Sequence, residues 1–284
     1  MSKEIIRVPI TVLAKKMSKR ASDSQFQFSF QPKLFVNTKL LSDDKGKLST
    51  TDENVSPNLI GTCVDYLTRL IFCQSLDAFD ISKKGAAILK KIPEFEKIYS
   101  DLIASLKKKE KINNKIIADA LQLCGYDVVY RAGKEFYVPV QSIVPNNVTC
   151  NHIKMMLNRV DKLFKQIGIP SRTEFEVESL KKSIFGDGDF LSYKYLLDFK
   201  TLSGKILSKN TLQILIYYVL GKQQQIYPEF QTIEQLMMYN PRKDILFTCD
   251  VDEIQDKVKQ MSECIDYFDC KINALNIKLM ETGL

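Results

Sequence analysis

The chain of 284 residues has little histidine and no paired cysteine motif, and both absences exclude kinds of chemistry. His152 is the single histidine, which argues against a zinc site and against catalysis by a Ser/His or Cys/His pair. The seven cysteines are scattered, odd in number and free of any C-x-x-C motif. We therefore expect reduced, packed thiols and favour them over disulfides or an iron–sulfur cluster.

Long apolar runs are missing too. No stretch approaches the roughly 20 apolar residues that cross a bilayer, and the first residues, MSKEIIR, are too polar for a secretory signal. We therefore expect a cytoplasmic protein without membrane contact. Charged residues make up 26% of the chain and hydrophobic residues 45%, which is typical of a globular protein and excludes a disordered or collagenous one.

Arginine is scarce, because only seven of the forty-one basic residues are arginine. The net charge of +7 is therefore carried almost wholly by lysine. Lysine presents a point charge without the planar fork with which arginine reads base edges, so such a surplus suits sequence-neutral contact with phosphates. The charge is compatible with nucleic acid as a partner but does not by itself select a function.

Hydrophobic periodicity divides the chain into a helical first half and a mixed second half. We predict a loop over 41–57 and a helix start at Ser56-Pro57. The predicted helices cover residues 58–75, 83–109, 113–123, 151–166, 210–220 and 251–280. The predicted strands cover residues 175–180, 189–192, 195–200, 233–239 and 245–249. This order of elements predicts an α/β protein.

Two carboxylates and a lysine lie on two of these short strands. The first strand region reads GDGD over 186–189, and the second reads DFK over 198–200. Side chains two apart on a strand share a face, so Asp198 and Lys200 point the same way, and a hairpin would bring Asp189 to the same end. Magnesium prefers one or two carboxylates plus waters and phosphate oxygens. The pattern predicts a site for Mg²⁺ or Mn²⁺ with a lysine that assists a metal-bound water or stabilises phosphate charge.

These motifs resemble those of the PD-(D/E)XK nuclease superfamily, most closely its RecB-like exonuclease branch. In that pattern a G-x-x-D strand precedes a (D/E)-x-K strand, and the following helix carries Q-x-x-x-Y, here Gln213 and Tyr217. Residues four apart on a helix share a face, so both side chains are expected to face the strand ends. Each motif alone is also typical of an exposed turn or a solvated face, but their order and spacing favour a nuclease site.

The resemblance extends to a helix with a G-T-x-x-H pattern, whose histidine ligates the metal in this branch. Here residues 61–65 read GTCVD, with Asp65 in the histidine position. Aspartate is a competent ligand for a hard cation. An ion pair or hydrogen bond with Arg69, one turn further along the helix, is an equally good interpretation of Asp65.

The family also places a glutamate before the G-x-x-D strand. Glu174, Glu176 and Glu178 alternate onto one face of the predicted strand, and we favour Glu176 or Glu178 as the metal ligand. For contact with a nucleic-acid backbone we expect lysines beside the motifs, namely Lys194, Lys205 and Lys209.

Taken together, the resemblance implies a restriction-endonuclease-like core, with a small mixed β-sheet flanked by helices. It implies a single domain over 1–284 with a helical insertion over 77–170. The implied activity is metal-dependent hydrolysis of DNA phosphodiester bonds, in DNA repair or antiviral defence, with a helicase/ATPase or a defence-complex protein as a candidate partner. The alternative is a non-catalytic DNA- or protein-binding subunit that retains the nuclease fold. The missing histidine and the large helical half favour this alternative.

Overall fold

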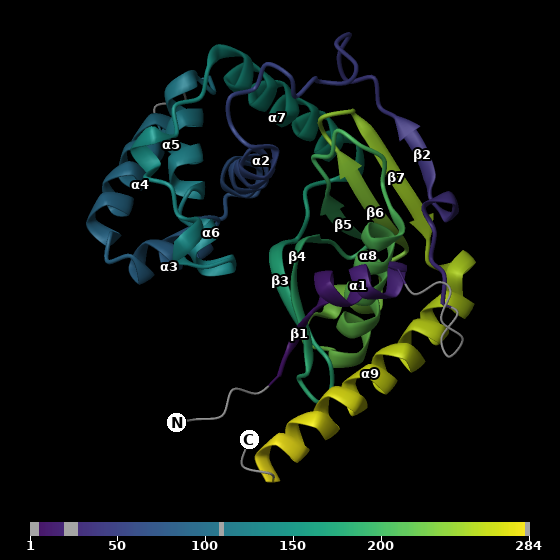
Figure 1. Cartoon of the computed structure of the whole chain (residues 1–284). Coiled ribbons are helices and arrows are strands. Elements are labelled where there is room, and N and C mark those ends of the chain that lie inside the picture. The colour runs from purple at the N-terminus through teal and green to yellow at the C-terminus, as the bar shows by residue number, and fades with distance from the viewer. Residues whose placement is uncertain (1–5, 20–27, 108–110, 282–284) are drawn as a thin grey trace.

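The computed structural model describes residues 6–19, 28–107 and 111–281 (Figure 1). Within these ranges, helices flank a seven-stranded mixed sheet, and a further group of helices lies to one side of it. The chain is therefore an α/β protein, as its sequence predicts. None of the helices in the described part combines the length and the apolar character that a membrane span requires.

The sheet has the strand order β1-β4-β5-β6-β7-β2, and β3 pairs with β4 outside that path. The pairs β1–β4 and β5–β6 are parallel, and the others are antiparallel. The strands are β1 (Val8–Pro9), β2 (Val36–Lys39), β3 (Arg172–Glu178), β4 (Ile184–Leu191), β5 (Tyr195–Phe199), β6 (Gln235–Asn240) and β7 (Ile245–Asp250).

The helices divide between the sheet and the lateral group. The α-helices are α1 (Ile10–Lys19), α2 (Pro57–Phe72), α3 (Asp80–Ile88), α4 (Ile92–Lys107), α5 (Asn114–Cys124), α6 (Asp127–Arg131), α7 (Asn147–Ile167), α8 (Ser208–Gln224) and α9 (Gln255–Glu281). Short 3-10 helices cover Pro32–Leu34, Lys134–Phe136, Val140–Ser142, Pro228–Gln231 and Asp252–Ile254.

Most predicted elements are present, with shifted ends. Helix α2 begins where predicted, because the Ser56 hydroxyl accepts a hydrogen bond from the N–H of Leu59. The single helix predicted over 83–109 is wrong: it is two helices, α3 and α4, separated at Lys90, which has a φ of 59°. Residues 108–110 lie outside the described ranges. Helices α3 to α7 fall within the span 77–170, and its status as an insertion stays a prediction.

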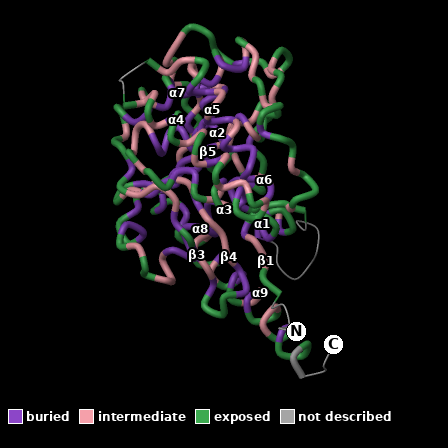
Figure 2. Tube along the Cα trace, turned by 90° about the vertical axis from the view of Figure 1, so that its left-hand side faces the viewer, coloured by how far each residue is buried: buried purple, intermediate pink, exposed green. Residues whose placement is uncertain are grey.

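Three clusters of buried apolar residues form the core, and buried residues lie both in the sheet layer and in the layer of lateral helices (Figure 2). Helices α1, α8 and α9 share one cluster with the sheet, and the second half of α7 packs on the other face of the sheet. The third cluster holds together the lateral group, which consists of α2 to α6 and the first half of α7. On β5, Leu196 belongs to the α8 side, whereas Leu197 and Phe199 belong to the α7 side. Because strand side chains alternate, Asp198 lies on the α8 side.

The cysteines agree with the sequence-based expectation of packed thiols. All seven are free, and five of them are buried.

Candidate functional site

A chain of side-chain contacts joins the end of β5 to α8. Lys200 Nζ forms an ion pair with Asp198 Oδ2 and donates a hydrogen bond to Gln213 Oε1 at 3.3 Å. Gln213 Nε2 in turn donates to Tyr217 OH at 2.9 Å. Asp198 and Tyr217 are each 3% exposed. The structure thus brings the D-x-K and Q-x-x-x-Y residues into one contact chain, in which Asp198 and Tyr217 are buried.

Asp189, on β4, lies beside this chain. Its Oδ2 accepts a hydrogen bond from the backbone N–H of Phe199 at 2.7 Å. The Asp189 side chain is 25% exposed, against 5% for the side chain of Asp198. Asp189 is therefore the carboxylate of the pair that faces solvent more.

Arg69, on α2, lies buried among three carboxylates. Its Nη2 contacts Asp65 Oδ2 at 2.8 Å and Asp189 Oδ1 at 3.7 Å, and its Nη1 contacts Glu174 Oε2 at 3.2 Å. Its Nε also donates to Asp65 Oδ1 at 3.1 Å. The ion pair between Asp65 and Arg69, one of the two interpretations of Asp65, is thus formed. It connects Asp65 to the other carboxylates through the guanidinium.

Carboxylates outnumber cationic side chains in this site by two. The four carboxylates and two cations in contact are Asp65, Glu174, Asp189 and Asp198, with Arg69 and Lys200. A divalent cation would balance this excess, and oxygen ligands are the kind that Mg²⁺ and Mn²⁺ take.

The excess negative charge and the burial alter the titration of these groups. Burial raises the pKa of Asp65 and of Asp198 to about 7, although Arg69 and Lys200 oppose the shift. Burial likewise raises the pKa of Glu174. For Lys200, burial alone would lower the pKa, but Asp198 and Asp189 outweigh it and the net shift is upward. Lys200 therefore stays charged, while Asp65 and Asp198 exchange protons near neutral pH.

Glycines let the elements of the site approach closely. At Gly61, on α2, an added Cβ would stand 2.4 Å from Thr201 Oγ1, in the loop that follows Lys200. At Gly186 it would stand 3.2 Å from the ring of Tyr217. The glycines of the GTCVD and GDGD motifs thus allow α2 and α8 to pack against this end of the sheet.

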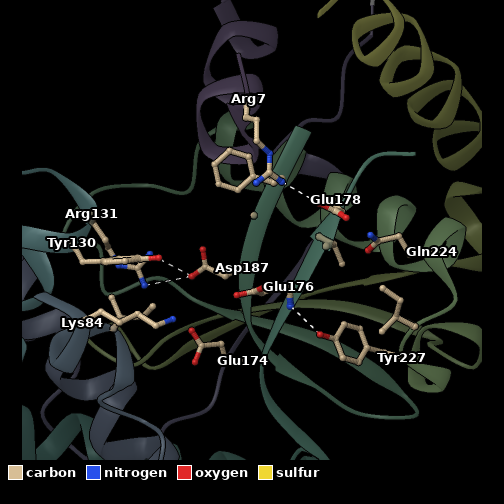
Figure 3. A pocket seen from close by; sticks show the side chains of 15 residues that line it. Arg7, Lys84, Tyr130, Arg131, Glu174, Glu176, Glu178, Asp187, Gln224 and Tyr227 are labelled. Atoms are coloured by element: carbon tan, nitrogen blue, oxygen red, sulfur yellow. Dashed lines mark hydrogen bonds and ion pairs between the residues drawn. The ribbon is translucent and has the colours of Figure 1, made fainter. Parts of the chain in front are cut away.

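The glutamates favoured from the sequence lie further along β3 than Glu174, and all three glutamates line one cavity. Glu176 and Glu178 line a cavity of about 470 Å³ beside β3 and β4 (Figure 3), where Glu178 forms an ion pair with Arg7 at 3.0 Å. The glutamate that reaches Arg69 is Glu174, which has a φ of 60°. This left-handed backbone interrupts the regular strand geometry at Glu174, and no pattern in the sequence marks it.

The same cavity separates the lateral helices from the sheet. Arg131 of α6 and Lys84 of α3 lie across from the carboxylates of β3 and β4 (Figure 3). Arg131 Nη1 contacts Asp187 Oδ2 at 3.3 Å. Asp187 is thereby paired outside the contact chain, although it belongs to the GDGD motif.

The lysines that we predict to contact a nucleic-acid backbone lie at different ends of the sheet. Lys194 is in the turn before β5, whereas Lys200 follows that strand, so a five-residue strand, about 17 Å, separates them. Lys205 and Lys209 are exposed in the loop after Lys200 and in the first turn of α8. Only these two therefore lie on the side of the contact chain.

Comparisons with family models, curated proteins and solved structures give no match for this chain. Within the described ranges, no three His, Cys, Asp or Glu side chains are grouped so that they could hold a metal ion. The guanidinium of Arg69 lies among three of the carboxylates instead.

Proposed function

We propose that the chain is a divalent-metal-dependent nuclease that hydrolyses DNA phosphodiester bonds. The observation that carries this proposal is the contact chain from Asp198 through Lys200 and Gln213 to Tyr217. Its residues come from the motifs that resemble the PD-(D/E)XK superfamily, and these motifs fall on β4, β5 and α8 in the order of that pattern. A restriction-endonuclease-like fold is part of the same proposal.

The carboxylates fit a hard divalent cation in chemistry and in charge. Magnesium is commonly held by one or two carboxylates together with waters and substrate phosphates, so Asp189 and Asp198 suffice without a third protein ligand. When bound, the ion would polarise the phosphate and lower the pKa of a water molecule. Of the other carboxylates, Asp65 and Glu174 are available only if Arg69 moves away from them.

Lys200 is suited to stabilise negative charge on the scissile phosphate. Its pKa is shifted upward, so it is protonated at neutral pH and does not serve as a base toward water. Gln213 accepts a hydrogen bond from Lys200 and is held by Tyr217, so these two are positioning residues in the metal-free site.

One observation favours a second candidate function, a non-catalytic subunit that retains the fold. Arg69 already supplies a buried positive charge to Asp65, Glu174 and Asp189. A site whose negative charge is partly offset in this way has less need of a metal, as a binding subunit would.

Titration calorimetry with Mg²⁺ and Mn²⁺, beside cleavage assays on single- and double-stranded DNA, separates the two functions. The variants are Asp198→Asn and Lys200→Met, with Asp187→Asn as the control, because Asp187 is two residues from Asp189 but pairs with Arg131. A nuclease binds the metal, loses about 100-fold or more of its cleavage rate in the first two variants and keeps it in the control. Cleavage that survives both substitutions would contradict the assignment. DNA binding without metal binding or cleavage would support the subunit.

A further inference from the structure

Three lysines from separate segments line a second cavity, of about 300 Å³. Lys39 ends β2, Lys47 follows in the next loop, and Lys243 lies in the turn between β6 and β7. Lys243 Nζ donates a hydrogen bond to the carbonyl of Gly204, which precedes Lys205. The cavity is thereby connected to the loop that follows Lys200.

The carboxylates of this cavity are already engaged. Asp43 accepts hydrogen bonds from Arg159 on both oxygens, each at 2.7 Å. Asp244 accepts hydrogen bonds from Ser42 and from the hydroxyl of Tyr239, the latter at 2.7 Å. These acids are therefore occupied by partners other than the lysines.

Lys243, by contrast, lies near enough to Lys47 and Lys205 for their charges to act on it. Burial lowers the pKa of Lys243, and the charges of Lys47 and Lys205 lower it further. Within the described part of the chain, none of Lys39, Lys47, Lys205 and Lys243 forms an ion pair with a carboxylate. An anion in the cavity would relieve this repulsion.

Two hydrogen bonds to the loop after β5 fix the cavity relative to the candidate metal centre, which is formed by Asp189 and Asp198. The N–H of Lys200 donates to the carbonyl of Tyr239, and Asn240 Nδ2 donates to the carbonyl of Leu202, each at 2.8 Å. The loop from Lys200 to Lys205 is therefore held against the end of β6. The five residues from Lys200 to Lys205 span at most about 17 Å, so a nucleic-acid strand can contact both of these lysines within a few nucleotides.

We propose that Lys39, Lys47, Lys205 and Lys243 bind the phosphate backbone of a nucleic-acid strand that extends into the candidate metal centre. We call these four residues the lysine surface. The inference deepens the proposed nuclease function and rests on it. A concave surface at the same end of the sheet as the contact chain fits a strand better than a flat lipid headgroup layer. Because lysine has no base-reading fork, binding is expected to be independent of base sequence.

Fluorescence anisotropy with a labelled DNA strand in EDTA tests the lysine surface without any cleavage. The test variant is Lys47→Gln with Lys205→Gln and Lys243→Gln. The control replaces Lys83, Lys97 and Lys115, which are exposed on the lateral helices, by Gln. We expect the test variant to bind about 10-fold or more weakly, with the slope of log affinity against log salt concentration reduced by about two for the three lost phosphate contacts, and the control to match the wild type. The double variant Lys47→Gln with Lys205→Gln keeps the Lys243 hydrogen bond and guards against misfolding.

The outcomes distinguish this inference from the proposed function. Equal weakening in test and control variants, or no weakening, would overturn the lysine surface. Binding to anionic vesicles but not to DNA would overturn it as well. If the test variants lose DNA binding while the wild type neither binds metal nor cleaves, the lysine surface stands and the nuclease assignment fails. If cleavage depends on Asp198 but DNA binding is unchanged in the lysine variants, the nuclease assignment stands and the lysine surface fails.

Discussion

Asp189 Oδ2 accepts a hydrogen bond from the backbone N–H of Phe199 at 2.7 Å, so the carboxylate of the G-x-x-D motif is tied to the residue between Asp198 and Lys200. This bond keeps the two motifs in register at the end of the β4–β5 pair. It also commits one oxygen of Asp189, while the other faces Arg69 at 3.7 Å.

Substitutions of Asp189 separate its structural role from its charge. Asp189→Asn retains an oxygen that accepts from Phe199, so we expect a stable protein whose Mg²⁺ affinity falls about 10-fold or more. Asp189→Ala loses the bond as well and should lower the free energy of unfolding by about 1–3 kcal/mol. Urea unfolding and calorimetry measure the two effects. Equal stability of both variants would show that the hydrogen bond contributes little.

Replacement of Arg69 tests whether its guanidinium competes with a metal ion. Arg69→Gln leaves three carboxylates without their shared cation, so metal-free protein should lose about 3–5 kcal/mol of stability. Its affinity for Mg²⁺ should rise several-fold, because the carboxylates lose a competing charge. Arg131→Gln, which removes the ion pairs of Arg131 with Asp127 and Asp187, serves as the control for Mg²⁺ affinity. Weaker Mg²⁺ binding in Arg69→Gln would instead mean that Arg69 positions the carboxylates for the ion.

The raised pKa of Asp65 predicts a pH-dependent stability. Burial raises it from 3.8 to about 7, so the folded protein binds the extra proton between these values and loses stability as pH rises through about 7. The amide of Asp65→Asn does not ionise in this range, so the variant lacks this pH dependence. Between about pH 5 and pH 8, in EDTA, the wild type should lose about 2 kcal/mol relative to the variant. Urea unfolding at the two pH values checks this, and a constant difference between the proteins would contradict it.

The parts of the site that the sequence predicts are those formed by nearby residues. The strands with Asp189 and Asp198 and the helix with Gln213 follow one another along the chain, so their motifs mark them directly. Glu174 is different, because strand alternation places it on the same face as Glu176 and Glu178 and could not separate the three, and no sequence pattern marks its left-handed φ.

Remote pairing explains why strands β1 and β2 were missed. Strand β2 is short and wholly exposed, and it pairs with β7, about 200 residues later. Strand β1 has two residues and pairs with β4 in parallel. Neither strand has an apolar alternation of its own, so local patterns could not reveal them.

Gly188 offers a test of packing next to the site. An added Cβ there would stand 2.0 Å from the ring of Phe175, which is 1% exposed. Gly188→Ala should therefore lower the free energy of unfolding by about 1–3 kcal/mol. Adding Phe175→Leu makes room and should restore part of that stability. The comparison requires Phe175→Leu alone as a control, and a double variant no better than the sum of the single ones would rule out this contact.

The position of Arg69 also bears on how the whole chain unfolds. Arg69 and Asp65 belong to a helix of the lateral group, whereas Glu174 and Asp189 belong to the sheet. Pulling the two layers apart would therefore break the contacts of Arg69 with Glu174 and Asp189, and Arg69 would keep only Asp65, on its own helix. Neither layer gains by opening alone, so we expect the lateral helices and the sheet to unfold in one cooperative transition, with no half-folded form accumulating.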